Sequence, residues 1–142
     1  MRNGHTLLEL CVVLLLAALA ASVALPAGRH LHDTFAVVAG RDALAGLIAE
    51  ARAMAPGNGG ASVHLRDGPW RAWAEAGGTW LRSVELSRDL GVTVVLPRGR
   101  RSLDLQFDVL GLGQVASETV VLQRGDSRRA LIVSSYGRVR RP

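Results

Sequence analysis

The most constraining feature of this sequence is an uncharged apolar run near its amino terminus. The run extends from Leu10 to Leu25, carries its single hydroxyl on Ser22, and is closed by Pro26. Counted from His5, the segment has 21 residues, and about 20 apolar residues in a helix span the hydrocarbon core of a bilayer. The sequence therefore predicts a transmembrane helix over residues 5–27, because a buried core helix of this length would carry a polar stripe.

One carboxylate, Glu9, lies inside the apolar segment near its amino-terminal end. A charge deep in a bilayer costs about 2.5 kcal/mol or more unless it is paired, so we expect Glu9 to have a partner and a function. Five residues before Glu9, the short leader Met1-Arg2-Asn3-Gly4 ends in glycine. This arrangement resembles the class III signal of type IV pilins and type II secretion pseudopilins.

The resemblance implies a processing site, an assembly site and a bend. A prepilin peptidase would cut between Gly4 and His5 on the cytoplasmic side, and the new amino terminus at His5 would be N-methylated. The family usually has phenylalanine where this chain has His5. The assembly glutamate of the family corresponds to Glu9, and its helix-kinking proline at the membrane exit corresponds to Pro26.

Two other interpretations of the amino terminus compete with this one. The first is an ordinary secretory signal peptide, with Arg2 as the basic region and Ala18-Leu19-Ala20 as the cleavage site. Glu9 beside the apolar core and the continuation of the run past Ala20 argue against it. The second is a plain single-span membrane anchor.

Composition and charge limit the rest of the chain. After the leader and the membrane helix, a chain of 142 residues leaves one small domain, and the single cysteine, Cys11, gives that domain no disulfide. All 17 basic residues are arginine. From Arg98 to Pro142 nine arginines face four acids, a net charge of +5, whereas His5 to Pro97 has a net charge of −1. Such a basic surplus attracts nucleic acid, acidic partners or anionic lipid.

Beyond Pro26 the pattern remains helical over residues 28–55, an amphipathic continuation that Pro26 should bend and not end. Residues 56–60, Pro-Gly-Asn-Gly-Gly, then stop the helix. The apolar stripe of this continuation, at three- and four-residue steps, is predicted to consist of Leu31, Phe35, Val38, Leu44, Leu47, Ile48, Ala51 and Met54.

Residues 61–142 show short alternating segments separated by glycine-containing turns, which predict strands. The predicted strands are Ser62–Arg66, Trp70–Glu75, Thr79–Leu86, Val92–Leu96, Leu103–Asp108, Thr119–Arg124 and Arg129–Ser134. A long amino-terminal helix packed on an antiparallel β-sheet domain is an α+β, pilin-like fold. The three tryptophans, Trp70, Trp73 and Trp80, are predicted to serve core or sheet packing.

The carboxy-terminal half resembles one branch of the minor pilins, the GspH/FimT family. The matching segments include Leu105-Gln106-Phe107-Asp108, Leu131-Ile132-Val133-Ser134 and Gly137-Arg138-Val139-Arg140. This resemblance implies a minor pseudopilin of the type II secretion system, a structural component of the periplasmic pseudopilus. Its partners would be other pseudopilins or pilins, the prepilin peptidase, the inner-membrane assembly platform and membrane lipid. The chain would cross the bacterial inner membrane once, with its amino terminus cytoplasmic and its carboxy-terminal domain periplasmic.

The alternative is a FimT-like minor type IV pilin that binds DNA through its basic tail. The residues implied are Arg138, Arg140 and Arg141, and the contacts would be with phosphate and hence sequence-independent. We find no catalytic, metal-binding or cofactor motif: His30 and His32 are two residues apart and do not share a helix face, and Ser134 lacks a nucleophile-elbow pattern. The sequence therefore predicts a protein that is not an enzyme and needs no cofactor.

Overall fold

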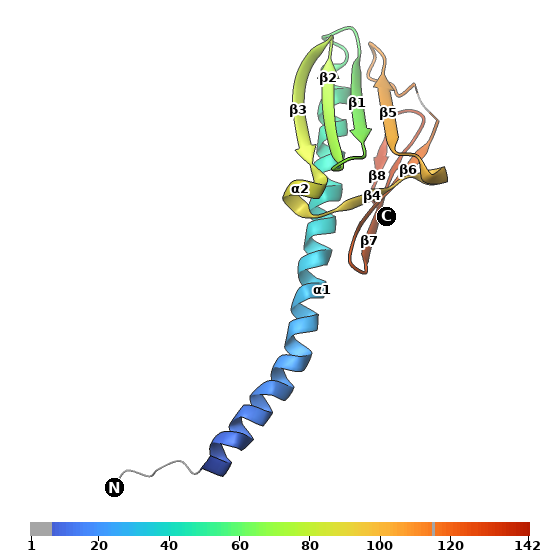
Figure 1. The fold of residues 1–142 in the computed structure, drawn as a ribbon. Helices are drawn as coiled ribbons and strands as arrows, with labels where there is room; N and C mark the ends of the chain where they lie inside the picture. Colours follow the sequence, from blue (N-terminus) through green and yellow to red (C-terminus); the bar gives the residue numbers. More distant parts are fainter. Residues whose placement is uncertain (1–6, 115) are drawn as a thin grey trace. The chain divides into compact units, whose positions relative to one another are not determined.

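The computed structural model describes residues 7–114 and 116–142. In these residues one long helix precedes a series of short antiparallel strands (Figure 1). The chain divides into two compact units, one ending at His32 and the other comprising Asp33–Pro142, and the boundary falls inside the long helix. The layout is the α+β architecture expected from the sequence, so the predicted fold class is confirmed.

The predicted strands are all present, with ends shifted by one or two residues at most positions. The helices are α1 (Leu7–Met54), α2 (Leu86–Leu90) and the 3-10 turn η1 (Pro97–Gly99). The strands are β1 (Ala61–Arg66), β2 (Arg71–Ala76), β3 (Thr79–Glu85), β4 (Thr93–Val95), β5 (Ser102–Phe107), β6 (Glu118–Arg124), β7 (Ser127–Val133) and β8 (Val139–Arg140).

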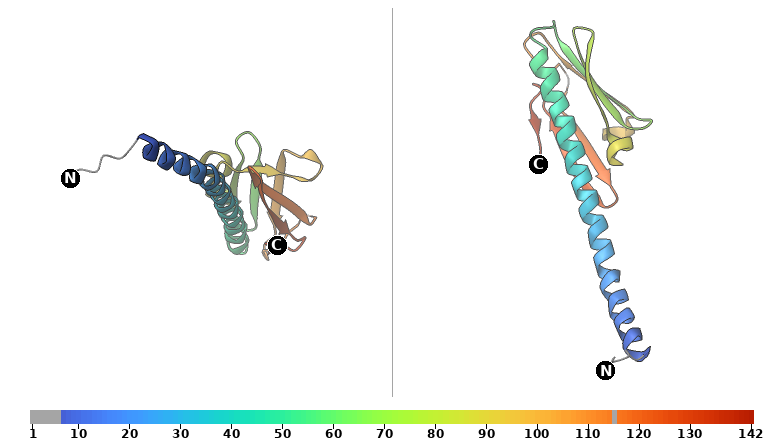
Figure 2. Two further views of the ribbon diagram at one scale, coloured as in Figure 1. Left: turned by 90° about the horizontal axis from the view of Figure 1, so that it is seen from below. Right: turned by 90° about the vertical axis from the view of Figure 1, so that its left-hand side faces the viewer.

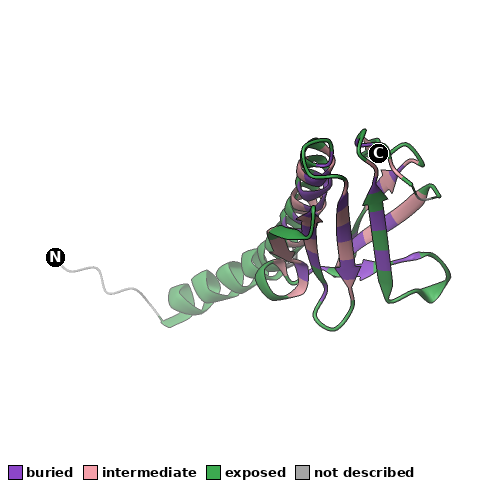
Figure 3. Ribbon diagram, turned by 90° about the horizontal axis from the view of Figure 1, so that it is seen from above, coloured by how far each residue is buried: buried purple, intermediate pink, exposed green. Residues whose placement is uncertain are grey.

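The strands form two four-stranded antiparallel sheets. Sheet A has the order β3-β2-β1-β5, and sheet B has the order β4-β6-β7-β8. The chain therefore leaves sheet A for β4, returns to it for β5, and ends in sheet B. Buried positions alternate with partly or fully exposed ones along β1, β2 and β5, as in the exposed-buried repeat of β5 (Figure 3). Because side chains alternate between the two faces of a strand, one face of each of these three strands packs into the core.

The core of the second unit lies between residues 33–54 of α1 and both sheets (Figure 2). Leu44 and Ile48 of α1 share a small void of about 10 Å³ with side chains of β1, β5 and β6. Gly40 permits close approach, because a Cβ atom there would lie 3.3 Å from Leu122 Cδ2. Polar contacts add to this packing: Arg124 Nε lies 2.9 Å from Asp33 Oδ1.

The predicted apolar stripe of the helix is only partly correct. Leu44, Leu47, Ile48 and Ala51 are buried, but Leu31, Phe35 and Met54 are exposed, and Phe35 is exposed to 71%. The physical reason is helical phase. Phe35 lies nine residues before Leu44, about two and a half turns, so the two side chains point in opposite directions. Both are apolar, and sequence periodicity alone did not show which of them faces the sheets.

The structure differs from the predicted strands at two places. Leu86 was expected to end a strand, but it begins α2 and is fully buried. The second difference concerns the carboxy terminus, where β8 pairs with β7 through Ile132↔Arg140 and Val133↔Val139. The tail is therefore the edge strand of sheet B and is not a free end.

Candidate functional site

The amino-terminal landmarks lie partly outside the described residues. Gly4 and His5, the predicted cleavage and methylation positions, are among residues 1–6, which the structure does not describe. Glu9 is exposed in the first turn of α1, where a carboxylate is favoured by the positive end of the helix dipole. Helix α1 continues through position 26, so Pro26 does not end it. A kink at Pro26 stays a prediction.

The first part of α1 has the length and composition of a membrane span. Among the described residues, α1 is the one helix that is long and apolar enough to span a membrane. Its most apolar window of 18 residues has a mean hydropathy of 2.6. None of that window is buried by protein. A soluble core helix would bury such a surface, so the exposed apolar surface is consistent with contact to lipid or to other helices.

The predicted DNA-binding arginines lie on or next to the edge strand β8. A tight turn sets its position: Ser134 N donates to Arg138 O at 2.9 Å, and Gly137 N donates to Ser134 O at 2.8 Å. Gly137 has a φ of 75°, and a Cβ atom there would lie 2.7 Å from the Phe107 ring. Glycine is therefore required to bring the strand back against sheet B.

The three arginines have different surroundings. Arg141 Nη1 lies 3.3 Å from Asp42 Oδ1 of α1, so this side chain is held by an ion pair. Arg138 and Arg140 are exposed, and the described residues give neither of them a carboxylate partner. Both line a hollow of about 510 Å³ that also contains Tyr136 and Val139. Two cationic groups beside an aromatic ring are thus available to an anionic ligand.

A second basic group lies at the opposite end of the β6–β7 hairpin. The register pairs Arg124 with Ser127, which places Arg128 and Arg129 next to the turn. The tail pairs with the other end of β7, about 15–20 Å away at 3.3 Å per residue. Among the described residues these arginines therefore form two separate basic groups at opposite ends of the hairpin. Arg124 is structural, because it also donates from Nη1 to Leu90 O at 2.6 Å.

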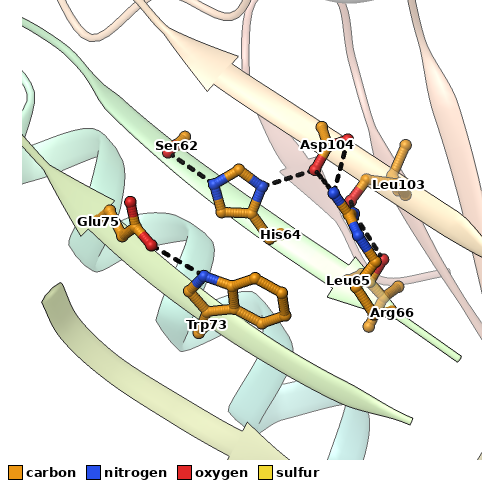
Figure 4. Close-up of polar contacts among 8 residues, drawn as sticks. All are labelled: Ser62, His64, Leu65, Arg66, Trp73, Glu75, Leu103 and Asp104. Atoms are coloured by element: carbon orange, nitrogen blue, oxygen red, sulfur yellow. Dashed lines mark hydrogen bonds and ion pairs between the residues drawn. The ribbon is translucent and has the colours of Figure 1, made fainter. Parts of the chain in front are cut away.

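A polar network that sequence reasoning missed covers the outer face of sheet A (Figure 4). His64 Nδ1 lies 2.6 Å from Asp104 Oδ1, and His64 Nε2 lies 3.0 Å from Ser62 Oγ. Arg66 Nη2 lies 2.7 Å from the same Asp104 oxygen. Beside them the rings of His64 and Trp73 are 5.1 Å apart. No sequence motif marks this network, because strand pairing alone brings residues 40 positions apart into contact.

The charge state of Asp104 follows from these contacts. Partial burial would raise the pKa of Asp104, but hydrogen bonds from His64 and Arg66, together with the positive charge of Arg66, lower the pKa below its usual value. Asp104 is therefore a carboxylate at neutral pH, and it is able to accept both hydrogen bonds. The network loses this stabilisation as the pH falls through the lowered pKa.

The tryptophans are placed differently from one another. Trp70 is buried in the core, as predicted, and Trp80 is 57% exposed. Trp73 donates from Nε1 to Glu75 Oε1 at 3.0 Å. The guanidinium carbons of Arg66 and Arg71 lie 5.7 and 6.0 Å from the centre of its ring. Trp73 therefore serves sheet packing on the solvent side.

Within the described part of the chain, no three side chains of His, Cys, Asp or Glu gather as a metal site would require. No protein-family model and no curated protein matches the sequence.

Solved structures do match the fold. One crystal structure of the type IV minor pilin FimU from Pseudomonas aeruginosa aligns with a TM-score of 0.58 at 18% identity, covering 75% of this chain and 87% of that chain. A second crystal form of the same pilin gives a TM-score of 0.55 at 17% identity, covering 73% and 90%. The chain therefore has a type IV pilin-like fold, a long amino-terminal helix packed on antiparallel sheets.

Proposed function

We propose that the chain is a minor subunit of a type IV pilin-like filament, anchored in the bacterial inner membrane with its β-rich domain in the periplasm. The observation that carries this proposal is the fold shared with a type IV minor pilin, combined with an apolar helix that no protein surface covers. In this scheme residues 1–4 are the leader, 5–27 the transmembrane helix, 28–55 its amphipathic continuation and 61–142 the periplasmic domain.

Maturation follows from the leader. The prepilin peptidase removes residues 1–4, and the amino group of His5 is then methylated. Glu9 pairs with the α-amine of a neighbouring subunit, because that amine is a cation available at the same depth of the membrane. Pairing offsets the cost of burying the carboxylate and sets the axial position of an entering subunit. The assembly platform of the inner membrane and membrane lipid are further partners.

The outward face of α1 in the second unit supports assembly through helix packing. Apart from Phe35, Asp42 and Met54, the exposed residues of this helix segment are small, namely Ala39, Gly46, Ala49 and Ala53. Small side chains let helix backbones approach closely, as in helix pairs that pack tightly. The face opposite to it is buried against the sheets, so both sides of the helix have a structural use.

The finer assignment is a GspH-like minor pseudopilin of the type II secretion system, a structural component of the pseudopilus that drives protein export. A FimT-like minor pilin of a type IV pilus is the second candidate. One observation favours the second: Arg138 and Arg140 are exposed beside Tyr136 without carboxylate partners among the described residues. Arginine forks bind phosphate oxygens, which suits DNA.

A deletion strain separates the two candidates. Cells lacking the chain are assayed in parallel for exported protein in the medium and for uptake of labelled DNA, and each defect is complemented with the intact gene. Loss of export alone supports the pseudopilin, and loss of uptake alone supports the DNA-binding pilin. If both processes stay normal and the chain is absent from purified filaments, the filament proposal is wrong.

A further inference from the structure

The outer face of sheet A carries a hydrogen-bonded chain of serine, histidine and aspartate beside a polar hollow. We propose that Ser62, His64 and Asp104 form a nucleophilic site that hydrolyses small acyl esters. This site would act whether or not the chain assembles into a filament. It gives the chain an activity that the sequence, which lacks a catalytic motif, did not predict.

Strand register places the three side chains. Ser62 and His64 are two residues apart on β1 and therefore lie on the same face of the sheet. Asp104 on β5 is the direct partner of His64. Because Asp104 is a carboxylate, His64 Nδ1 carries the proton and donates to Asp104 Oδ1 at 2.6 Å. His64 Nε2 then accepts from the Ser62 hydroxyl at 3.0 Å, as a base that activates a nucleophile must.

Further contacts fix the base in this orientation. The His64 ring lies against Trp73, with ring centres 5.1 Å apart and planes inclined by 31°. Arg66 Nη2 holds Asp104 by contacts of 2.7 Å to Oδ1 and 3.0 Å to Oδ2. Asp104 is therefore a positioning residue for His64. A base held in this way needs little reorganisation when it takes a proton.

A hollow of about 310 Å³ lies next to Ser62. Its lining includes Ser62, Glu75 and Gln106 together with four glycines. Gln106 is the register partner of Ser62 on β5, and its side-chain amide is a donor for a developing oxyanion. The Glu75 carboxylate accepts from Trp73 Nε1 and so is held by its own contact. The largely polar lining of the hollow suits a short acyl group such as acetyl better than a long apolar chain.

The reaction balances without a redox partner. Ser62 Oγ attacks the ester carbonyl carbon while its proton passes to His64 Nε2, and collapse of the oxyanion expels the alcohol, which takes that proton. Water then attacks the Ser62 acyl ester, gives a proton to His64 Nε2 and releases the carboxylic acid. His64 returns the proton to Ser62 Oγ, which restores the starting state.

The test uses the full chain, purified in detergent micelles, with a serine-directed fluorophosphonate and with p-nitrophenyl acetate. We expect one covalent adduct, located at Ser62 by peptide mass spectrometry, and an acetyl-Ser62 intermediate at early times. Ser62→Ala should abolish both, and His64→Gln should slow labelling about 100-fold or more, within the range for removal of a general base. Ser102→Ala is the matched control, since Ser102 is exposed on β5 outside the hollow, and it should react like the unmodified chain.

A second measurement isolates the positioning role of Asp104. In Asp104→Asn the nitrogen-15 spectrum should show His64 losing its Nδ1-protonated form, and labelling should slow in parallel. Far-ultraviolet circular dichroism shows that each variant is folded. Labelling of Ser62 no faster than of Ser102, or ester hydrolysis unchanged in Ser62→Ala, would overturn the proposal and leave the network with a structural role alone.

Discussion

Truncation of Leu44 to alanine is the most direct test of how α1 is oriented on the sheets. Leu44 is 2% exposed and borders a void of only about 10 Å³. The core around it is therefore tightly packed, and a smaller side chain would leave a new cavity. Those neighbours belong to β1, β5 and β6, and the loss therefore affects both sheets. The predicted result is a large fall in the free energy of unfolding of the second unit.

The magnitude follows from two contributions. Leu44→Ala removes three carbon atoms from the core, about 2.4 kcal/mol at about 0.8 kcal/mol for each buried methylene. The cavity left behind adds about 1–2 kcal/mol when the surroundings relax only partly. We therefore expect a loss of about 3.4–4.4 kcal/mol, a large part of the stability of an ordinary small domain.

The assay is urea unfolding of the full chain in detergent micelles, followed by tryptophan fluorescence. With a slope of about 1–1.5 kcal/mol per molar urea, the transition midpoint should fall by about 2.3–4.4 M. Phe35→Ala is the matched control, because it also truncates a large apolar side chain of α1 but at a position that is 71% exposed. Its midpoint should change by about 0.5 M or less. Equal losses in the two variants would refute the assigned face of the helix.

Three further predictions concern the proposed roles. Gly4→Glu should leave the uncut precursor in the membrane, and mass spectrometry of the normal chain should find a mature amino terminus at His5. Glu9→Val should leave membrane insertion and cleavage intact but reduce the amount of chain in purified filaments, because the pairing that offsets burial is lost. Arg138→Ala/Arg140→Ala should weaken binding of short duplex DNA in an anisotropy titration, and binding by the unmodified chain should fall steeply with salt.

Each of these three predictions would be contradicted by a specific result. A mature chain beginning near Ala21 would indicate an ordinary signal peptide. Normal incorporation of Glu9→Val would mean that the carboxylate has no part in assembly. For DNA binding the control is Arg128→Ala/Arg129→Ala, which also removes two positive charges but at the other end of the hairpin. An equal loss of DNA affinity in this control would show that binding depends on net charge and not on the tail. Absence of DNA binding even at low salt leaves the pseudopilin assignment.

Local patterns in the sequence were sufficient to predict the fold class. The unbroken apolar run fixed a long helix, and the change from steps of three and four to a period of two marked where strands begin. Glycine-containing turns located most strand ends to within two residues. These features are local, because helix and strand periodicities act between residues close together in the chain.

Pairing between distant segments was decided by tertiary structure. Which strands share a sheet, and the return of β8 to β7, depend on contacts that no local pattern specifies. The same holds for the helix face, since Phe35 and Leu44 are both apolar and only packing against the sheets selects Leu44. Exposed Phe35 thus belongs to a surface that sequence periodicity had assigned to the core.

The sequence by itself determined the apolar helix, its glutamate and the charge surplus of the carboxy-terminal half, because these depend on residue type and order alone. Tertiary structure decided which arginines are available: Arg141 is held by Asp42 of α1, whereas Arg138 and Arg140 face outward. It also created the contact of His64 with Asp104, two residues that are 40 positions apart. Such contacts arise from strand register, which is set by the packing of the whole domain and not by the neighbours of either residue.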